Sequence, residues 1–135
     1  MSKVANVVYT GSLHNDITHL ASGAVISTDA PVDNHGKGEA FSPSDLLASA
    51  VAACAITVMG IKASDMGVNM DGTRAEVAKE MATNPRRVSA VTVDFYLPAA
   101  LDAKSRTILE ATAHACPVSK SLSADVVQTL RFHYA

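Results

Sequence analysis

The sequence is poor in aromatic side chains and has no long run of positive charge. Its 135 residues include no tryptophan, and phenylalanine and tyrosine together make up only 4%. Eleven lysines and arginines stand against 13 aspartates and glutamates, and the longest basic run is Arg86-Arg87. Nucleic-acid and polybasic membrane binding both rely on clustered positive charge, so we expect neither a nucleic-acid partner nor a membrane-surface partner.

Cysteine is also scarce, and the only two, Cys54 and Cys116, lie far apart in the chain. Residues 1–11 show neither the long apolar stretch of a secretion signal nor the Arg-rich pattern of a transit peptide, so a cytoplasmic location is expected. A permanent disulfide is not expected in that reducing compartment. Two cysteines then indicate buried thiols, a metal site or transient redox chemistry.

A single domain over residues 1–135 is expected, because a chain of this length can bury a core without disulfide support. The order of strand-like and helix-like patterns predicts an α+β fold. Strands are expected at about 3–10, 23–28, 73–81, 91–97 and 126–134, and helices at about 43–66, 102–113 and 117–122.

The longest predicted helix has no charged residue from position 46 to position 61. Ser42-Pro43-Ser44-Asp45 is typical of a helix cap with an acidic first turn, and Gly67 is a typical stop. This uncharged run is shorter than the roughly 20 residues that span a bilayer, so we interpret it as a buried helix. Steps of three and four predict an inward-facing stripe that contains Cys54, namely Leu47, Val51, Cys54, Val58 and Ile61.

Cys116 precedes Pro117, and proline is favoured at the first position of a helix, so Cys116 is predicted to cap a short helix. Helix N-termini stabilise thiolates, as do nearby cations such as Lys120 or a protonated His114. Position in the sequence therefore favours Cys116 as the more activated thiol. Cys54, Cys116 and His114 form an alternative set of metal ligands, which we disfavour because there is no CxxC pair. We expect no metal.

Several motifs are spread along nearly the whole chain: Tyr9-Thr-Gly11, Ser22-Gly23, Thr28-Asp-Ala-Pro31, Gly36-Lys-Gly-Glu-Ala-Phe-Ser-Pro-Ser-Asp-Leu-Leu47, Ala52-Ala-Cys54 and His114-Ala-Cys-Pro-Val118. As a set they resemble the OsmC/Ohr family of thiol-dependent hydroperoxide reductases, and specifically its shorter OsmC-like branch. The resemblance implies an OsmC-like α+β fold, in which antiparallel sheets wrap around long central helices in an intertwined homodimer.

The resemblance also implies a cysteine-based peroxidase of the oxidative-stress response, with its active site at the subunit interface. Cys54 on the central helix would be the peroxidatic cysteine, and Cys116 would be the resolving cysteine. The substrate would be an organic hydroperoxide and the reductant an external dithiol. No cofactor is implied.

In the peroxidase branches of the family, an arginine from the first hairpin lies beside the attacking thiol and is held by a glutamate just before the double-leucine motif. Here the first arginine is Arg74, and Ser44 stands at the position of the glutamate. Candidate supporting residues are therefore Ser44, Asp45, Glu39 and His14. Alternative sources of the missing positive charge are His19, Lys37, Arg86 and Arg87. This departure keeps an alternative open, a non-catalytic thiol redox sensor or small-molecule binding module on the same fold.

Overall fold

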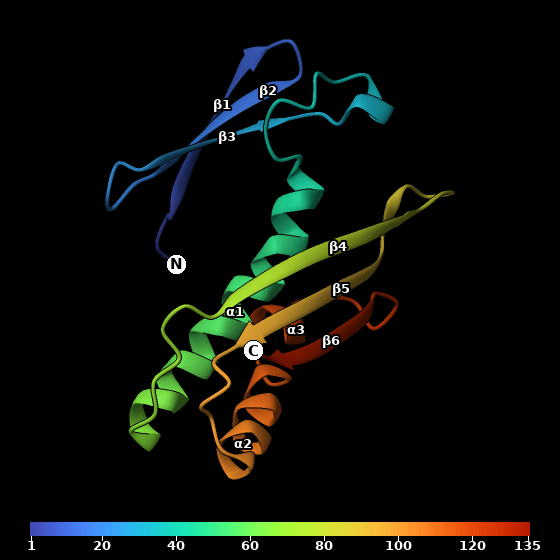
Figure 1. Cartoon of the computed structure of the whole chain (residues 1–135). Coiled ribbons are helices and arrows are strands. Elements are labelled where there is room, and N and C mark those ends of the chain that lie inside the picture. The colour runs from blue at the N-terminus through green and yellow to red at the C-terminus, as the bar shows by residue number, and fades with distance from the viewer. The chain divides into compact units, whose positions relative to one another are not determined.

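The computed structural model describes residues 1–135 and confirms the α+β fold class (Figure 1). Its strands are β1 (Ala5–Gly11), β2 (His14–His19), β3 (Val25–Asp29), β4 (Arg74–Ala82), β5 (Arg87–Leu97) and β6 (Val127–Tyr134). The helices are α1 (Pro43–Met66), α2 (Ala103–Ala113) and α3 (Pro117–Ser121), with a short 3-10 turn at Val32–Asn34.

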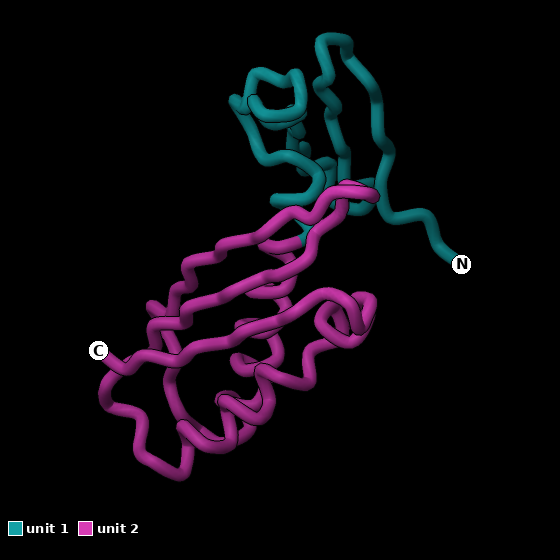
Figure 2. The backbone as a smooth tube through the Cα atoms, turned by 90° about the vertical axis from the view of Figure 1, so that its right-hand side faces the viewer, with its two compact units in different colours: residues 1–47 teal, residues 48–135 magenta.

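The chain divides into two compact units, Met1–Leu47 and Ala48–Ala135 (Figure 2). Each unit contains one three-stranded sheet, with strand order β1-β2-β3 in the first and β4-β5-β6 in the second. That both units belong to one domain over residues 1–135 stays a prediction.

The sheet of the first unit is antiparallel throughout. Its middle strand, β2, was not among the predicted strands, because its sequence HNDITH holds one aliphatic residue, Ile17, among polar ones. The strand pairs tightly because Ser12 and Leu13, at φ 55° and 61°, form a turn with two left-handed residues. Apolar side chains of the flanking strands are exposed: Val7, Val8, Tyr9, Val25 and Ile26.

The sheet of the second unit is centred on β5, which pairs antiparallel with β4 and parallel with β6. A parallel neighbour requires a crossover, and α2 and α3 supply it. Four alternate residues of β5 are buried as predicted: Val91, Val93, Phe95 and Leu97.

The ends of α1 are set by local signals that the sequence shows. The Ser42 hydroxyl accepts a hydrogen bond from the Asp45 N–H at 3.0 Å, and the Asp45 carboxylate accepts one from the Ser42 N–H at 3.0 Å, which closes a capping box. At the other end, Gly67 adopts a positive φ of 69°, and the N–H groups of Gly67 and Val68 donate back to Ser64 and Ala63. The predicted bounds of this helix are confirmed.

The buried face of α1 differs from the predicted stripe. Of that stripe only Val51 is fully buried, whereas Leu47 is 39% exposed and Ile61 is 61% exposed. The buried face consists of Ala48, Val51, Ala52, Ala55, Met59 and Ala63. The prediction failed because α1 is apolar around most of its circumference, so a period of 3.6 residues does not single out one face.

By length and composition alone, α1 could cross a membrane. Its most apolar 18 residues have a mean hydropathy of 1.9, and 33% of that window is buried inside the structure. The core helix of a soluble protein passes the same test. Because six residues of α1 belong to the hydrophobic core, we keep the interpretation of α1 as a core helix.

A charged cluster on the second sheet makes the stability of the fold depend on pH in the acidic range. Asp94 accepts two hydrogen bonds from Arg131, at 2.8 and 2.9 Å, and is bonded to His133 at 2.9 Å. The bonds to Arg131, and next the bond to His133, lower the pKa of Asp94 from 3.8 to about 2. Because the folded state has the lower pKa, this stabilisation is complete above pH of about 4 and is lost as the pH falls towards about 2.

We therefore expect Asp94→Asn to lower the melting temperature at neutral pH by a few degrees. The variant should also lose less of its remaining stability than the parent between about pH 4 and pH 2. Thermal unfolding followed by circular dichroism at a series of pH values would measure both effects. An identical acid dependence in parent and variant would contradict the assignment.

Candidate functional site

The structure brings together the two cysteines, which lie far apart in the sequence. Cys54 is half-buried in the middle of α1, and Cys116 is fully buried immediately before α3; both are free thiols. The two thiols lie near enough for Cys54 to raise the pKa of Cys116. Both cysteines belong to the second unit, so the pair lies within one compact part of the chain.

Cys116 caps α3 as predicted, but its thiol is not activated. The Cys116 Sγ accepts a hydrogen bond from the Ser119 N–H at 3.3 Å. Burial nevertheless raises the pKa of Cys116, and the nearby Cys54 thiol raises it further, while the N–H groups of Ser119 and Val118 lower it. The prediction that its position at a helix N-terminus lowers the pKa of Cys116 is therefore wrong, because the sequence does not show how completely the fold removes this thiol from water.

The cations expected near Cys116 are otherwise engaged or exposed. The His114 ring tilts against Phe132, with ring centroids 6.0 Å apart, and Lys120 lies on the exposed side of α3. Cys54 is partly buried and packs against the hydrophobic core, and Cys116 is part of that core. In such a setting a thiolate needs a cation or hydrogen-bond donors, since desolvation disfavours the charged form.

In the first unit, His14 forms a pair with a buried carboxylate. Its Nδ1 lies 2.6 Å from Asp29 Oδ1, its Nε2 lies 3.3 Å from Asp16 Oδ1, and the Asp29 side chain is only 7% exposed. The hydrogen bond to Asp29 raises the pKa of His14, so the imidazolium persists to a higher pH than usual. These groups border an open cavity of about 310 Å³, which is lined by Ser12, His14, Ser27, Asp29, Lys37, Glu39 and Ala40.

The other supporting candidates have structural partners of their own. The Glu39 N–H donates to Asp29 at 3.0 Å, and the exposed Glu39 side chain borders the same cavity. Asp45 caps α1, and the hydroxyls of Ser44 and Ser42 lie 3.1 Å apart. All four candidates belong to residues 1–47, so any role for them at Cys54 stays a prediction.

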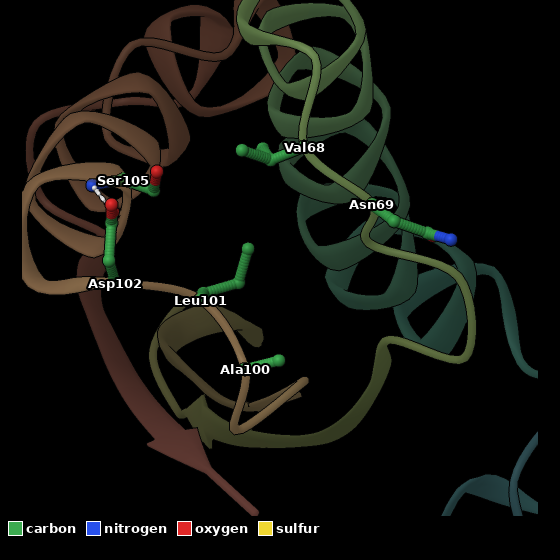
Figure 3. Close-up of a pocket in the computed structure, with 6 residues that line it drawn as sticks. All are labelled: Val68, Asn69, Ala100, Leu101, Asp102 and Ser105. Carbon is green, nitrogen blue, oxygen red and sulfur yellow. Dashed lines mark hydrogen bonds between the residues drawn. The ribbon is translucent and has the colours of Figure 1, made fainter.

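A second cavity, of about 250 Å³, contains neither cysteine (Figure 3). The side chains of Val68 and Leu101 point into its opening, whereas Asn69 points away. Asp102 accepts a hydrogen bond from the Ser105 N–H at 2.8 Å and thereby caps α2. The polar groups here thus serve local structure, and the cavity is not a candidate for thiol chemistry.

The chain is similar to proteins of one known family. The family description "OsmC-like protein" matches residues 36–131. A solved structure from Psychrobacter arcticus, named for an osmotic stress and detoxification response, is 48% identical, with a TM-score of 0.95 and coverage of 98% of this chain and 97% of that one. A search of curated proteins finds no match.

Two more distant structures share the fold. One is an organic hydroperoxide resistance protein OsmC from Legionella pneumophila, 18% identical, with a TM-score of 0.77 and coverage of 98% of this chain and 97% of that one. The other is an organic hydroperoxide resistance protein from Elizabethkingia anophelis, 15% identical, with a TM-score of 0.74 and coverage of 100% and 99%. At these identities the likeness shows the architecture alone.

Proposed function

Because this chain belongs to the family of OsmC-like proteins, we propose that it is a cytoplasmic, thiol-dependent reductase of organic hydroperoxides. Cys54 is the peroxidatic cysteine and Cys116 the resolving cysteine. The observation that carries the proposal is that two free thiols from distant parts of the sequence lie near enough for one to raise the pKa of the other. Hydroperoxide-resistance names among proteins of the same fold support the choice of substrate.

The reaction proceeds in three balanced steps. The Cys54 thiolate attacks one peroxide oxygen of ROOH, the O–O bond breaks, and the alcohol ROH leaves with a proton while Cys54 becomes a sulfenic acid. The Cys116 thiol then forms the S–S bond as the S–O bond breaks and water leaves. An external dithiol reduces the disulfide by thiol exchange and is itself oxidised to a disulfide. No cofactor takes part.

The burial of the two thiols supports this order. Cys54 is half-buried, whereas Cys116 is fully buried and has a pKa raised by that burial. A peroxide arriving from solvent therefore meets Cys54 first, and Cys116 is held back as the partner that reacts with the sulfenic acid. A resolving cysteine needs proximity to the sulfenic acid more than it needs exposure.

We propose His14 as the cation for Cys54. His14 lies on β2, in the first hairpin, and its pairing with the buried Asp29 favours the imidazolium. A nearby positive charge stabilises a thiolate. Among the other candidates, Glu39 lines the cavity beside His14, while Asp45 and Ser44 act at the start of α1.

We propose that the functional unit is a homodimer. Two-thirds of the most apolar window of α1 is not buried within one chain, and Leu47 and Ile61 are exposed on it. β1 and β3 also expose apolar side chains, and adjacent residues such as Val7 and Val8 point to opposite faces of the sheet. A second copy would cover these surfaces, and sedimentation should then give twice the 14.0 kDa of one chain.

Peroxide consumption in the presence of a dithiol separates the enzyme from the alternative, a redox sensor or binding module. We expect the protein to consume many equivalents of cumene hydroperoxide per chain with dithiothreitol as reductant, and to consume hydrogen peroxide more slowly because the thiols lie in apolar surroundings. A sensor would oxidise once per chain and stop, and a binding module would consume no peroxide. Either result would overturn the proposed function.

A further inference from the structure

The contacts around α3 point to a role for a residue outside the cysteine pair. Accepting the proposed function above, we propose that Gln128 is a positioning residue for the resolving cysteine. Its side chain holds α3 in place, so that the Ser119 N–H points at the Cys116 sulfur. Gln128 lies on β6, the strand that follows α3 in the chain, and no motif in the sequence singles it out.

Gln128 directs both ends of its carboxamide to the same residue. Its Oε1 accepts a hydrogen bond from the Ser119 hydroxyl, and its Nε2 donates to the Ser119 carbonyl oxygen at 3.0 Å. The Ser119 N–H donates in turn to Cys116 Sγ at 3.3 Å. Three hydrogen bonds thus connect β6, through one serine, to the resolving sulfur.

α3 needs such an anchor because it is only five residues long. Isolated helices of this length are not stable in water, so contacts outside the helix must fix its conformation. β6 is a suitable support, since it pairs with the central strand β5 along its whole length, and Gln128 itself is opposite Val91, which is buried. The carboxamide therefore fixes α3 to a strand of the sheet.

The consequence for chemistry follows from the burial of Cys116. Water does not reach this sulfur, so the N–H groups of Ser119 and Val118 are what stabilise its thiolate. When α3 becomes less ordered, these N–H groups no longer point at the Cys116 sulfur. The fraction of Cys116 present as thiolate then falls. Closure of the disulfide then slows, because the Cys116 thiolate must attack the Cys54 sulfenic acid, forming the S–S bond and expelling hydroxide, which leaves as water.

The test uses Gln128→Met, which keeps the length of the side chain and removes both hydrogen bonds. In the Cys54→Ser background Cys116 is the only thiol, and the ultraviolet absorbance of its thiolate can be titrated with the Cys54→Ser/Cys116→Ser protein subtracted as background. We expect Gln128→Met to reduce the thiolate fraction at a given pH by about tenfold. In the two-cysteine protein, single-turnover disulfide formation should slow by a similar factor.

Thr129→Val, at the exposed neighbouring position of β6, is the matched control and should change neither measurement. Ser119→Ala keeps the N–H but removes one of the two bonds to Gln128, and should give an intermediate shift. A thiolate titration that is the same in Gln128→Met as in the parent background would overturn the proposal. The titration needs no peroxide, so its outcome stays distinguishable from a failure of the proposed function.

Discussion

Cys54→Ser is expected to reduce hydroperoxide turnover to the background rate, a loss on the order of a thousandfold or more. A serine hydroxyl is a far weaker nucleophile than a thiolate at neutral pH, and no second thiol is placed to replace it at the peroxide, because Cys116 is fully buried. Dithiol-dependent loss of cumene hydroperoxide would measure the effect.

Cys116→Ser should behave differently, because it removes only the second step. Cys54 should still consume one equivalent of peroxide and then remain as a sulfenic acid or a more oxidised product. Mass spectrometry after trapping with dimedone would identify the sulfenic acid at position 54. The reverse pattern, with a trapped sulfenic acid at Cys116 in Cys54→Ser, would reverse the two roles. Parent-like turnover in both variants would end the peroxidase proposal.

Ser64→Ala, at an exposed position on α1 after Cys54, is a control for general effects of substitution in this helix. It should leave turnover within about twofold of the parent.

His14→Gln tests the proposed cation in the same assay. It should shift the pH profile of the first oxidation upwards while leaving the amount of sulfenic acid formed unchanged, since it removes a charge and not a reacting atom.

The sequence was most informative where local signals decide the structure. The capping box of Ser42 and Asp45 and the positive φ of Gly67 involve only neighbouring residues, so both ends of α1 could be predicted. Cys116 as a helix cap belongs to the same class, because Pro117 marks the first helical position. β5 was predictable too, since alternation between buried and half-buried side chains is a property of the strand itself.

Features decided by tertiary contacts were missed. β2 is polar along most of its length and becomes a strand because it lies between β1 and β3. The buried face of α1 is the side that packs against the second sheet and α2. Because the helix is apolar on almost every side, its sequence pattern does not show which side that is. The pKa of Cys116 was missed for the same reason. It is raised and not lowered, because distant segments pack over this thiol and bury it.

At the site, the pairing of Cys54 with Cys116 came from family resemblance and not from spacing, because the long stretch of chain between them gives no geometric constraint. Asp29, the partner of His14, lies in one of the quoted motifs, yet nothing in that motif marks it as a buried carboxylate. No sequence motif marks Gln128 as a functional residue. Each of these roles arises from a contact between segments that fold onto one another.

The largest effect on stability is expected from Phe95→Ala. Phe95 is 0% exposed in the central strand β5, and its ring stacks on Phe132 of the neighbouring strand with centroids 5.1 Å apart. Replacing a buried phenylalanine with alanine typically costs about 3–5 kcal/mol, because the lost contacts leave a cavity. A typical domain has only about 5–15 kcal/mol of stability, so the variant should be close to unfolding at physiological temperature.

Urea unfolding would measure this loss against Thr92→Ala, a half-buried position on the other face of β5 that should cost less than about 1 kcal/mol. Loss of the Phe95 ring should also disturb the positions of the two thiols. Phe95 and Cys116 belong to one continuous core, and Cys54 packs against it. Folded Phe95→Ala should therefore close the disulfide between Cys54 and Cys116 more slowly than Thr92→Ala does. Equal closure rates, with Phe95→Ala clearly destabilised, would show that the two thiols are held by contacts independent of this core.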